Sequence, residues 1–256
     1  MTANRVLQIS ALAGKIILEN GGEVYRVEET ISRICHAFGI KNVDSFATPT
    51  GLMMSLVDDD GHTHSLIKRI SSRGVNLDKI HQVNNLSRKL SVEPFTLDEV
   101  YSDLKNIEDQ KPFGDKLMIF CSALGAASFT FLFKGTINDF LCAFFIGFLI
   151  KITTLFSKKI QLNDFFINII GGSIGALFGY SLKALGLGDN MDTIIISSIM
   201  LLVPGMIVTN AIRDIIAGDL VSGTSRLMEA FFIAVAIAAG TGLTFKLIFL
   251  FGGITL

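Results

Sequence analysis

Cysteine is scarce in this sequence and an excess of basic charge is absent, and each of these features excludes a class of protein. There are three cysteines, Cys35, Cys121 and Cys142, an odd number without the spacing of a zinc site. We interpret them as reduced packing residues. The net charge is -1, and no basic stripe occurs in the first half of the chain. Nucleic acid is therefore excluded as a partner.

Catalytic motifs and a signal peptide are also absent. No Ser/His/Asp, Cys/His or phosphate-binding arrangement occurs at a recognisable spacing, so the sequence supports neither an enzyme nor a cofactor. Charged residues interrupt the apolar patches of the first twenty positions, namely Arg5, Lys15 and Glu19. We therefore expect no signal peptide, and we expect the polar half of the chain to stay in the cytosol.

Apolar residues, by contrast, are abundant and unevenly distributed. The chain of 256 residues is 50% hydrophobic and contains 21 phenylalanines, and its mean hydropathy of +0.55 is typical of contact with lipid. Residues 1–112 hold 28 charged residues and residues 113–256 hold 17. The sequence therefore predicts a cytoplasmic domain over 1–112, followed by a transmembrane domain over 113–256.

The second half contains five apolar runs close to the roughly 20 residues of helix that cross a bilayer core. These predicted spans cover about 115–133, 137–156, 163–183, 192–209 and 227–251. Lysine and arginine are more frequent on the flanks that a cytoplasmic N-terminus would place inside. The sequence thus predicts an α-helical polytopic membrane protein, with its N-terminus cytoplasmic and its C-terminus outside.

Small residues recur at every fourth position in two of these spans, and they predict faces where helix backbones approach closely. The stripes consist of Gly171, Gly175 and Gly179 in the third span and of Ala230, Ala234 and Ala238 in the fifth. Asn168 lies on the glycine side of the third span. Two interpretations of that face remain open: it only packs, or Asn168 also lines a polar path.

The first half has the pattern of a small α+β domain. Apolar periodicity and capping residues predict helices, and β-rich runs between turn residues predict an antiparallel meander. The helices are expected over 5–20, 24–38, 76–91 and 96–109, and the strands over 43–48, 51–57 and 63–70. His62 and His64 lie near three aspartates, but no spacing fixes a third ligand, so we predict an exposed polar hairpin and no metal site.

The second of these helices carries charges opposite its apolar stripe. Arg26, Glu29 and Arg33 are spaced so that the carboxylate lies between two guanidinium groups. Such a stripe is most simply a solvated face. The alternative interpretation is a docking surface for the membrane half or for a ligand with a carboxylate.

Residues 203–226, VPGMIVTNAIRDIIAGDLVSGTSR, place charges between two spans. On a helix, Asn210, Arg213 and Asp214 share one face and the isoleucines occupy the other. Pro204 and Gly205 stand where the fourth span would break. We therefore expect an amphipathic or broken helix at about 205–224, with its polar face in a water-filled cavity or, alternatively, at the membrane interface.

Four segments carry a resemblance to a known family. LVPGMIVTNAIRDIIAGDLVSGTSRLMEA resembles the signature of the threonine/serine exporter family, which includes ThrE and YjjP. GGEVYRVEETISRI, with Glu23 among its charges, and FATPTGL and VNNLSR are similar to the family's cytoplasmic motifs, in the same order and spacing. The resemblance covers about residues 8–245.

The resemblance implies an inner-membrane exporter of small hydrophilic metabolites, either amino acids such as threonine and serine or dicarboxylates such as succinate. Long members of the family carry a second helical half. This sequence ends after the first, which implies a separate small multi-span membrane subunit as its partner in a hetero-oligomer or homo-oligomer. The alternative function is a membrane-anchored cytosolic sensing or regulatory domain, against which five spans with glycine faces argue.

Export of a zwitterion or dianion requires a cation for the carboxylate and, in a proton-coupled secondary transporter, a group that exchanges protons. We expect Arg213 and Arg226 to bind the carboxylate. Asp214, Asp219 and Glu229 are the candidate proton acceptors or ammonium partners. For Glu229, an ion pair with Arg226 that anchors the end of a span is the competing interpretation.

Overall fold

The computed structural model describes residues 2–111 and 113–252, which form two compact units. The first unit contains the residues up to Lys111 together with Gly205–Met228, and the second contains residues 113–204 together with residues 229–252. Segment 205–228 was assigned from the sequence to the transmembrane half. By its contacts it belongs with the first unit.

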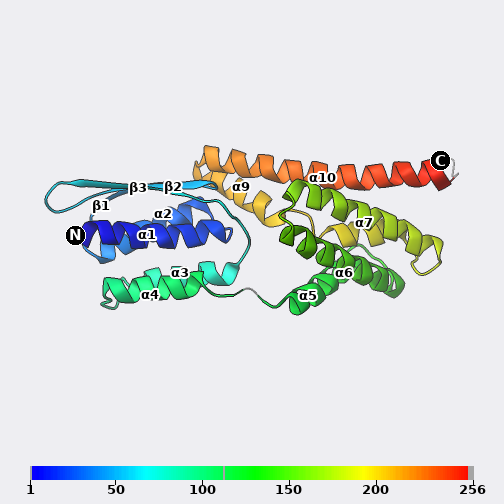
Figure 1. Cartoon of the computed structure of the whole chain (residues 1–256), viewed down its shortest axis with the longest axis horizontal. Coiled ribbons are helices and arrows are strands. Elements are labelled where there is room, and N and C mark those ends of the chain that lie inside the picture. The colour runs from blue at the N-terminus through cyan, green and yellow to red at the C-terminus, as the bar shows by residue number, and fades with distance from the viewer. Residues whose placement is uncertain (1, 112, 253–256) are drawn as a thin grey trace. The chain divides into compact units, whose positions relative to one another are not determined.

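The first unit contains four helices and a three-stranded sheet from the N-terminal part of the chain (Figure 1). They are α1 (Thr2–Glu19), α2 (Val24–Ala37), β1 (Asn42–Thr48), β2 (Gly51–Val57), β3 (Thr63–Arg69), α3 (Leu77–Lys89) and α4 (Leu97–Glu108). The sheet is antiparallel in the order β1-β2-β3. All seven elements match the predicted ones to within a few residues, and the Thr96–Glu99 capping box forms at the start of α4.

Helix α1 lies at the centre of the first unit. Its side chains are buried on most sides, including Leu7, Ile16 and Ile17, and it packs against α2, α3, α4 and the sheet. On β2, Leu52 and Leu56 complete this core. A helix that is apolar around most of its circumference requires partners on all sides, and the four neighbouring elements supply them.

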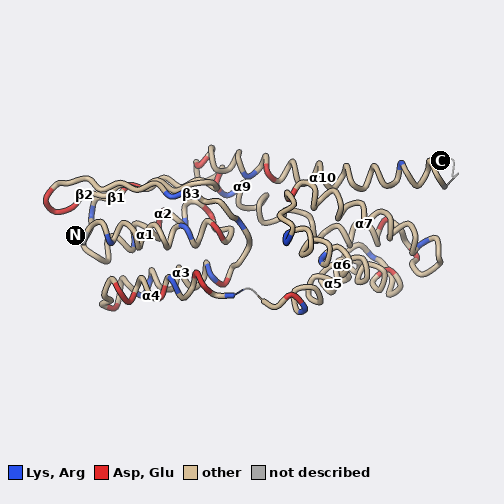
Figure 2. The backbone as a smooth tube through the Cα atoms, viewed as in Figure 1, with Lys and Arg blue, Asp and Glu red and all other residues tan. Residues whose placement is uncertain are grey.

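The second unit contains the helices that are long and apolar enough to cross a membrane. Within the described residues there are four: α5 (Asp115–Leu132), α6 (Ile137–Lys159), α7 (Asp164–Ala184) and α10 (Leu220–Gly252). Helix α10 begins in the first unit and continues into the second. Figure 2 shows how sparse the charges are along these four helices compared with the N-terminal ones.

The prediction of one continuous span over 192–209 is wrong. Helix α8 (Met191–Ile199) is followed by non-helical residues, and α9 (Gly205–Ala217) begins immediately after Pro204. Proline lacks an N–H and disfavours helical dihedrals in the residue before it, Val203. An apolar run that looks long enough by composition is therefore two short helices, and the described residues contain four candidate spans instead of five.

The glycine stripe of α7 is a helix contact face, as predicted. A Cβ atom built on Gly171 would lie 2.7 Å from the Leu202 side chain, and one on Gly175 would lie 2.9 Å from Ile199. A Cβ on Gly179 would overlap Ile195. The missing side chains thus let α7 pack directly against α8 and the turn that follows it.

Of the alanine stripe of α10, only Ala230 is buried, which corrects the prediction that the three alanines form one contact face. Ala234 and Ala238 are exposed, whereas Ile237 and Gly240 are buried. A Cβ on Gly240 would overlap the carbonyl oxygen of Ile169 in α7. The contact face of α10 is therefore centred on Gly240, because there the backbone of α7 approaches so closely that only glycine fits.

Candidate functional site

The turn between α1 and α2 presents its backbone to α9 and to the start of α10. Gly21 has a φ of +87°, and a Cβ on Gly22 would overlap the Ile17 side chain, so this conformation favours glycine at both positions. Asn210 donates a hydrogen bond to the Gly21 carbonyl oxygen at 2.8 Å. Arg226 donates one to the Gly22 carbonyl oxygen at 2.7 Å.

Glu23, the next residue of this turn, lies between two arginines. Nη1 of Arg213 is 2.6 Å from one carboxylate oxygen, and Nε of Arg26 is 2.8 Å from the other. The Glu23 side chain is only 10% exposed. Burial acts to raise the pKa of this carboxyl, but the hydrogen bonds from Arg26 and Arg213 outweigh burial and hold the pKa below its usual value.

A second ion pair is buried beside the first. Nε of Arg226 lies 3.0 Å from Oδ2 of Asp214, and the two side chains are 8% and 0% exposed. The N–H of Val24 also donates to Oδ1 of Asp214 at 3.3 Å. Burial raises the pKa of Asp214, although Arg226 and the Val24 N–H act in the opposite direction. We call Glu23, Arg26, Arg213, Asp214 and Arg226 the charged network.

The segments that carry the family resemblance meet in this first unit. In addition to the contacts of Gly21 and Gly22, the hydroxyl of Ser222 donates to the Ala47 carbonyl oxygen at 3.2 Å. The hydroxyl of Thr30 donates to the side-chain oxygen of Asn84 at 3.2 Å, which joins α2 to the VNNLSR segment. Residues separated by more than 170 positions in sequence thus share one set of polar contacts.

The predicted site residues Asp219, Glu29 and Arg33 also belong to the first unit but are not part of the charged network. Asp219 follows Gly218, whose φ is +95°, and the negative charge of Asp219 acts to raise the pKa values of Asp214 and Glu28. Glu29 pairs with Arg33 one turn along α2. That pair is separate from the charged network and, together with His36, lines an open hollow of about 570 Å³.

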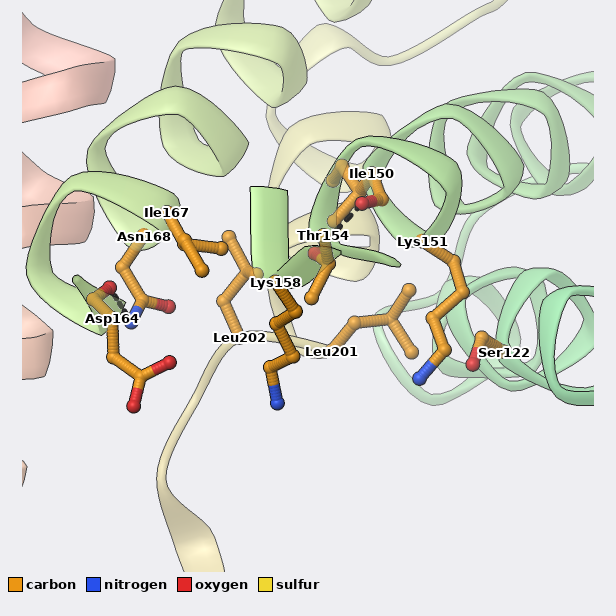
Figure 3. Close-up of a pocket in the computed structure, with 10 residues that line it drawn as sticks. All are labelled: Ser122, Ile150, Lys151, Thr154, Lys158, Asp164, Ile167, Asn168, Leu201 and Leu202. Atoms are coloured by element: carbon orange, nitrogen blue, oxygen red, sulfur yellow. Dashed lines mark hydrogen bonds between the residues drawn. The ribbon is translucent and has the colours of Figure 1, made fainter. Parts of the chain in front are cut away.

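Asn168 and Glu229 belong to the second unit. Asn168 donates to the Asp164 carbonyl oxygen at 2.8 Å and lines a pocket of about 180 Å³ (Figure 3). We call this the lysine pocket, because Lys151 and Lys158 also line it. Lys151 was not among the predicted site residues, because only the lysines and arginines on the flanks of the spans were considered. The feature that could have identified Lys151 is its position as an isolated charge inside an apolar run.

The hairpin between β2 and β3 brings metal-binding residue types together. Ligand atoms of Asp58, Asp60 and His62 lie within 4.8 Å of one another on a largely exposed turn. Oδ1 of Asp58 accepts the N–H groups of Asp60 and His62 at 3.1 and 2.8 Å, and His64 contacts the other oxygen at 2.8 Å. The Asp58 carboxylate therefore stabilises the turn through these hydrogen bonds.

Comparisons with known proteins address the identity of the chain. The ThrE family model, described as a threonine/serine exporter, matches residues 8–248. The "Threonine/serine exporter" of Corynebacterium glutamicum is 26% identical over 94% of this chain and 51% of its own length. "Probable succinate transporter subunit YjjP" of Klebsiella aerogenes is 24% identical over 88% of this chain and 86% of its own.

The corresponding YjjP protein of Escherichia coli K12 is 23% identical, over 92% of this chain and 91% of its own length. No solved structure matches the chain. The chain thus spans about half the length of the C. glutamicum relative and most of the length of the YjjP proteins. Because the family model covers nearly all of the sequence, the chain belongs to the threonine/serine exporter family.

Proposed function

We propose that this chain is a subunit of an inner-membrane exporter of small hydrophilic metabolites, either amino acids of the threonine/serine type or dicarboxylates such as succinate. Family membership and four helices with the length and composition of membrane spans support a multi-pass transport protein. The two substrate types come from the names of the relatives: threonine and serine from the C. glutamicum exporter, and succinate from the YjjP proteins.

The observation that carries the proposal is the buried Asp214–Arg226 pair within the family signature. A raised pKa lets Asp214 accept a proton more readily than an ordinary aspartate does. Once Asp214 is protonated, Arg226 loses the attraction of the Asp214 carboxylate charge, so the carboxylate of a substrate can compete for its guanidinium. The same residues would thus couple proton entry to metabolite exit, as in a secondary transporter.

The charged network gives Arg213 a second role in this scheme. Its guanidinium holds Glu23 of the first unit, so a substrate carboxylate would compete with Glu23 for the same cation. Asp219 would tune the proton affinity of Asp214 through its negative charge. Glu229, one turn after Arg226, and Asn168 complete the proposed substrate or proton pathway.

A small multi-span membrane subunit is the proposed partner. The YjjP relatives, 86% and 91% of whose lengths match this chain, are named as subunits of a transporter. We propose a cytoplasmic N-terminus. The start of α10 belongs to the same unit as the N-terminal residues, so α10 would begin on the cytoplasmic side and its C-terminal end would lie outside. Labelling of a cysteine introduced after α10 in intact cells tests this orientation.

Metabolite efflux tests the role of Arg213. Cells that express the chain with its partner are fed dipeptides or grown on dicarboxylates, and the released threonine, serine and succinate are measured. Arg213→Ala should abolish efflux, because the substrate loses its cation and Glu23 keeps only Arg26. Arg33→Ala, which removes another partly exposed arginine, should not abolish efflux. Normal efflux by a correctly inserted Arg213→Ala protein would remove this residue from the mechanism.

The alternative function, a membrane-anchored sensing or regulatory domain, has one observation in its favour. The hollow formed by Glu29, Arg33 and His36 on the first unit is large enough for a small metabolite. A sensor of this kind would bind its ligand without moving it. If Arg33→Ala no longer binds the metabolite but efflux is unchanged, the hollow serves sensing and is separate from export.

A further inference from the structure

Lys151 is an isolated charge in an apolar helix. Between Asp139 and Lys158, the sequence of α6 contains no other charged residue. The Lys151 side chain is half-buried among the helices of the second unit. A cation at such a position in a membrane helix is costly unless it faces a polar cavity or a counter-charge, so its presence indicates a function.

The lysine pocket provides the polar cavity. Its wall comes from α5, α6, α7 and the turn after α8, with Ser122, Thr154 and Asn168 as uncharged polar groups. Four aliphatic side chains complete the lining: Ile150, Ile167, Leu201 and Leu202. A volume of about 180 Å³ is smaller than the roughly 300–1,000 Å³ of pockets for drug-sized ligands. The pocket therefore suits a metabolite of few atoms.

The charges of the pocket are arranged asymmetrically. In Figure 3 the ammonium groups of Lys151 and Lys158 and the carboxylate of Asp164 extend toward the same side of the pocket, with Lys158 drawn between the other two. Among the described residues, the ammonium group of neither lysine forms an ion pair or hydrogen bond with a protein group. Thr154 and Asn168, by contrast, already donate to backbone carbonyl oxygens at 2.8 Å.

We propose that the lysine pocket binds the carboxylate of a small metabolite and that Lys151 is its counter-ion. This inference rests on the proposed export function and deepens it, because amino acids and dicarboxylates both carry the carboxylate that an ammonium group recognises. Lys158 adds a second cation at the exposed end of α6. Asp164 separates the two substrate types, since it attracts the ammonium group of an amino acid and repels the second carboxylate of a dicarboxylate.

Direct binding tests the site. The full chain is placed in lipid nanodiscs, and binding of L-threonine and of succinate is measured by titration calorimetry. Lys151→Met should weaken binding of whichever acid the wild type binds by about tenfold or more, because a charge-assisted hydrogen bond is lost. Lys151→Arg should keep most of the affinity. Lys159→Met, an exposed lysine of the same helix turn as Lys158 that does not line the pocket, is the matched control.

A second variant identifies the substrate type. Asp164→Asn should weaken threonine binding if the ligand is an amino acid, and it should leave succinate binding equal or stronger if the ligand is a dicarboxylate. Thermal unfolding of each variant checks that the fold is retained.

The outcomes for the pocket and for export are distinguishable. A wild-type chain that binds neither acid, or a folded Lys151→Met protein that binds as tightly as wild type, would overturn the pocket even if the cells export metabolites. Lysine-dependent binding without efflux would support the pocket and count against the export function instead.

Discussion

At the scale of single residues, the charged network contains two carboxyls with opposite pKa shifts. The pKa of Glu23 is lowered, so the stability that Glu23 contributes is present above its usual pKa and is lost as the pH falls through the lowered value. The pKa of Asp214 is raised, so the contribution of Asp214 is largest below its usual pKa and declines as the pH rises through the raised value. Arg226 limits that decline.

Removal of Arg226 should therefore destabilise the first unit in a pH-dependent way. Arg226→Met leaves the buried Asp214 carboxylate without its cation, and we expect a loss of about 3–5 kcal/mol at neutral pH. The loss should shrink in acid, because protonated Asp214 no longer needs a counter-charge. Thermal unfolding of the purified chain at several pH values measures the loss of stability and its dependence on pH.

The double variant Arg226→Met/Asp214→Asn is the informative companion, because it removes the orphaned charge and should recover part of the stability at neutral pH. Arg33→Met, which breaks a partly exposed pair with Glu29, should cost about 1 kcal/mol or less. A pH-independent loss in Arg226→Met would contradict the assignment of Asp214 as the buried charge.

At the scale of elements, two glycines of α10 provide a matched comparison. A Cβ on Gly240 would overlap the backbone of α7 at Ile169, whereas one on Gly242 would meet no atom within 4 Å. Gly240→Ala should force α7 and α10 apart and lower thermal stability by about 1–3 kcal/mol, as overpacking does.

Gly242→Ala should be neutral or stabilising by up to about 1 kcal/mol, because alanine favours a helix. Unfolding midpoints of the two variants in the same detergent or nanodisc measure the difference. Equal midpoints would show that the close approach of α7 and α10 does not contribute to stability.

The elements also show which features a sequence can predict. Capping residues and apolar periodicity placed α1 to α4 and the three strands correctly, because these signals are local. Hydropathy counts apolar length, so it read α8 and α9 as one span, although Pro204 and Gly205 predicted the break at which α9 begins. The α7 glycine face was predictable from the spacing of its glycines. The α10 contact face was not, because Gly240 is required by the close approach of the α7 backbone at Ile169, and no local pattern in the sequence reveals that approach.

For the candidate site, helical spacing placed Asn210 and Asp214 on one face of α9, and both are buried. The partners on that face, the carbonyl of Gly21 and the N–H of Val24, were not predictable, because they lie about 190 positions earlier in the sequence. Whether these residues bind substrate stays a prediction.

At the scale of the whole molecule, the first unit is built from two separate parts of the chain, up to Lys111 and 205–228. A fragment of residues 1–111 would lack every partner that the α1–α2 turn finds on α9 and α10. Joining 205–228 to that fragment through a flexible linker should raise its unfolding temperature and slow amide hydrogen exchange at Val24.

The same fusion with Asn210→Ala and Asp214→Ala is the control, and it should lose most of the gain. An unchanged unfolding temperature in the original fusion would show that residues 1–111 are stable without the second segment.

This discontinuity bears on the order in which the protein is made. The Gly22 carbonyl leaves the ribosome 204 residues before Arg226, its partner, and α5, α6 and α7 are translated in between. Helices α1 to α4 and the sheet can fold first, as domains generally do during synthesis. The α1–α2 turn, however, stays without Arg213 and Arg226 until α9 and the start of α10 have been translated. The first unit is therefore completed only after α5, α6 and α7 have been made.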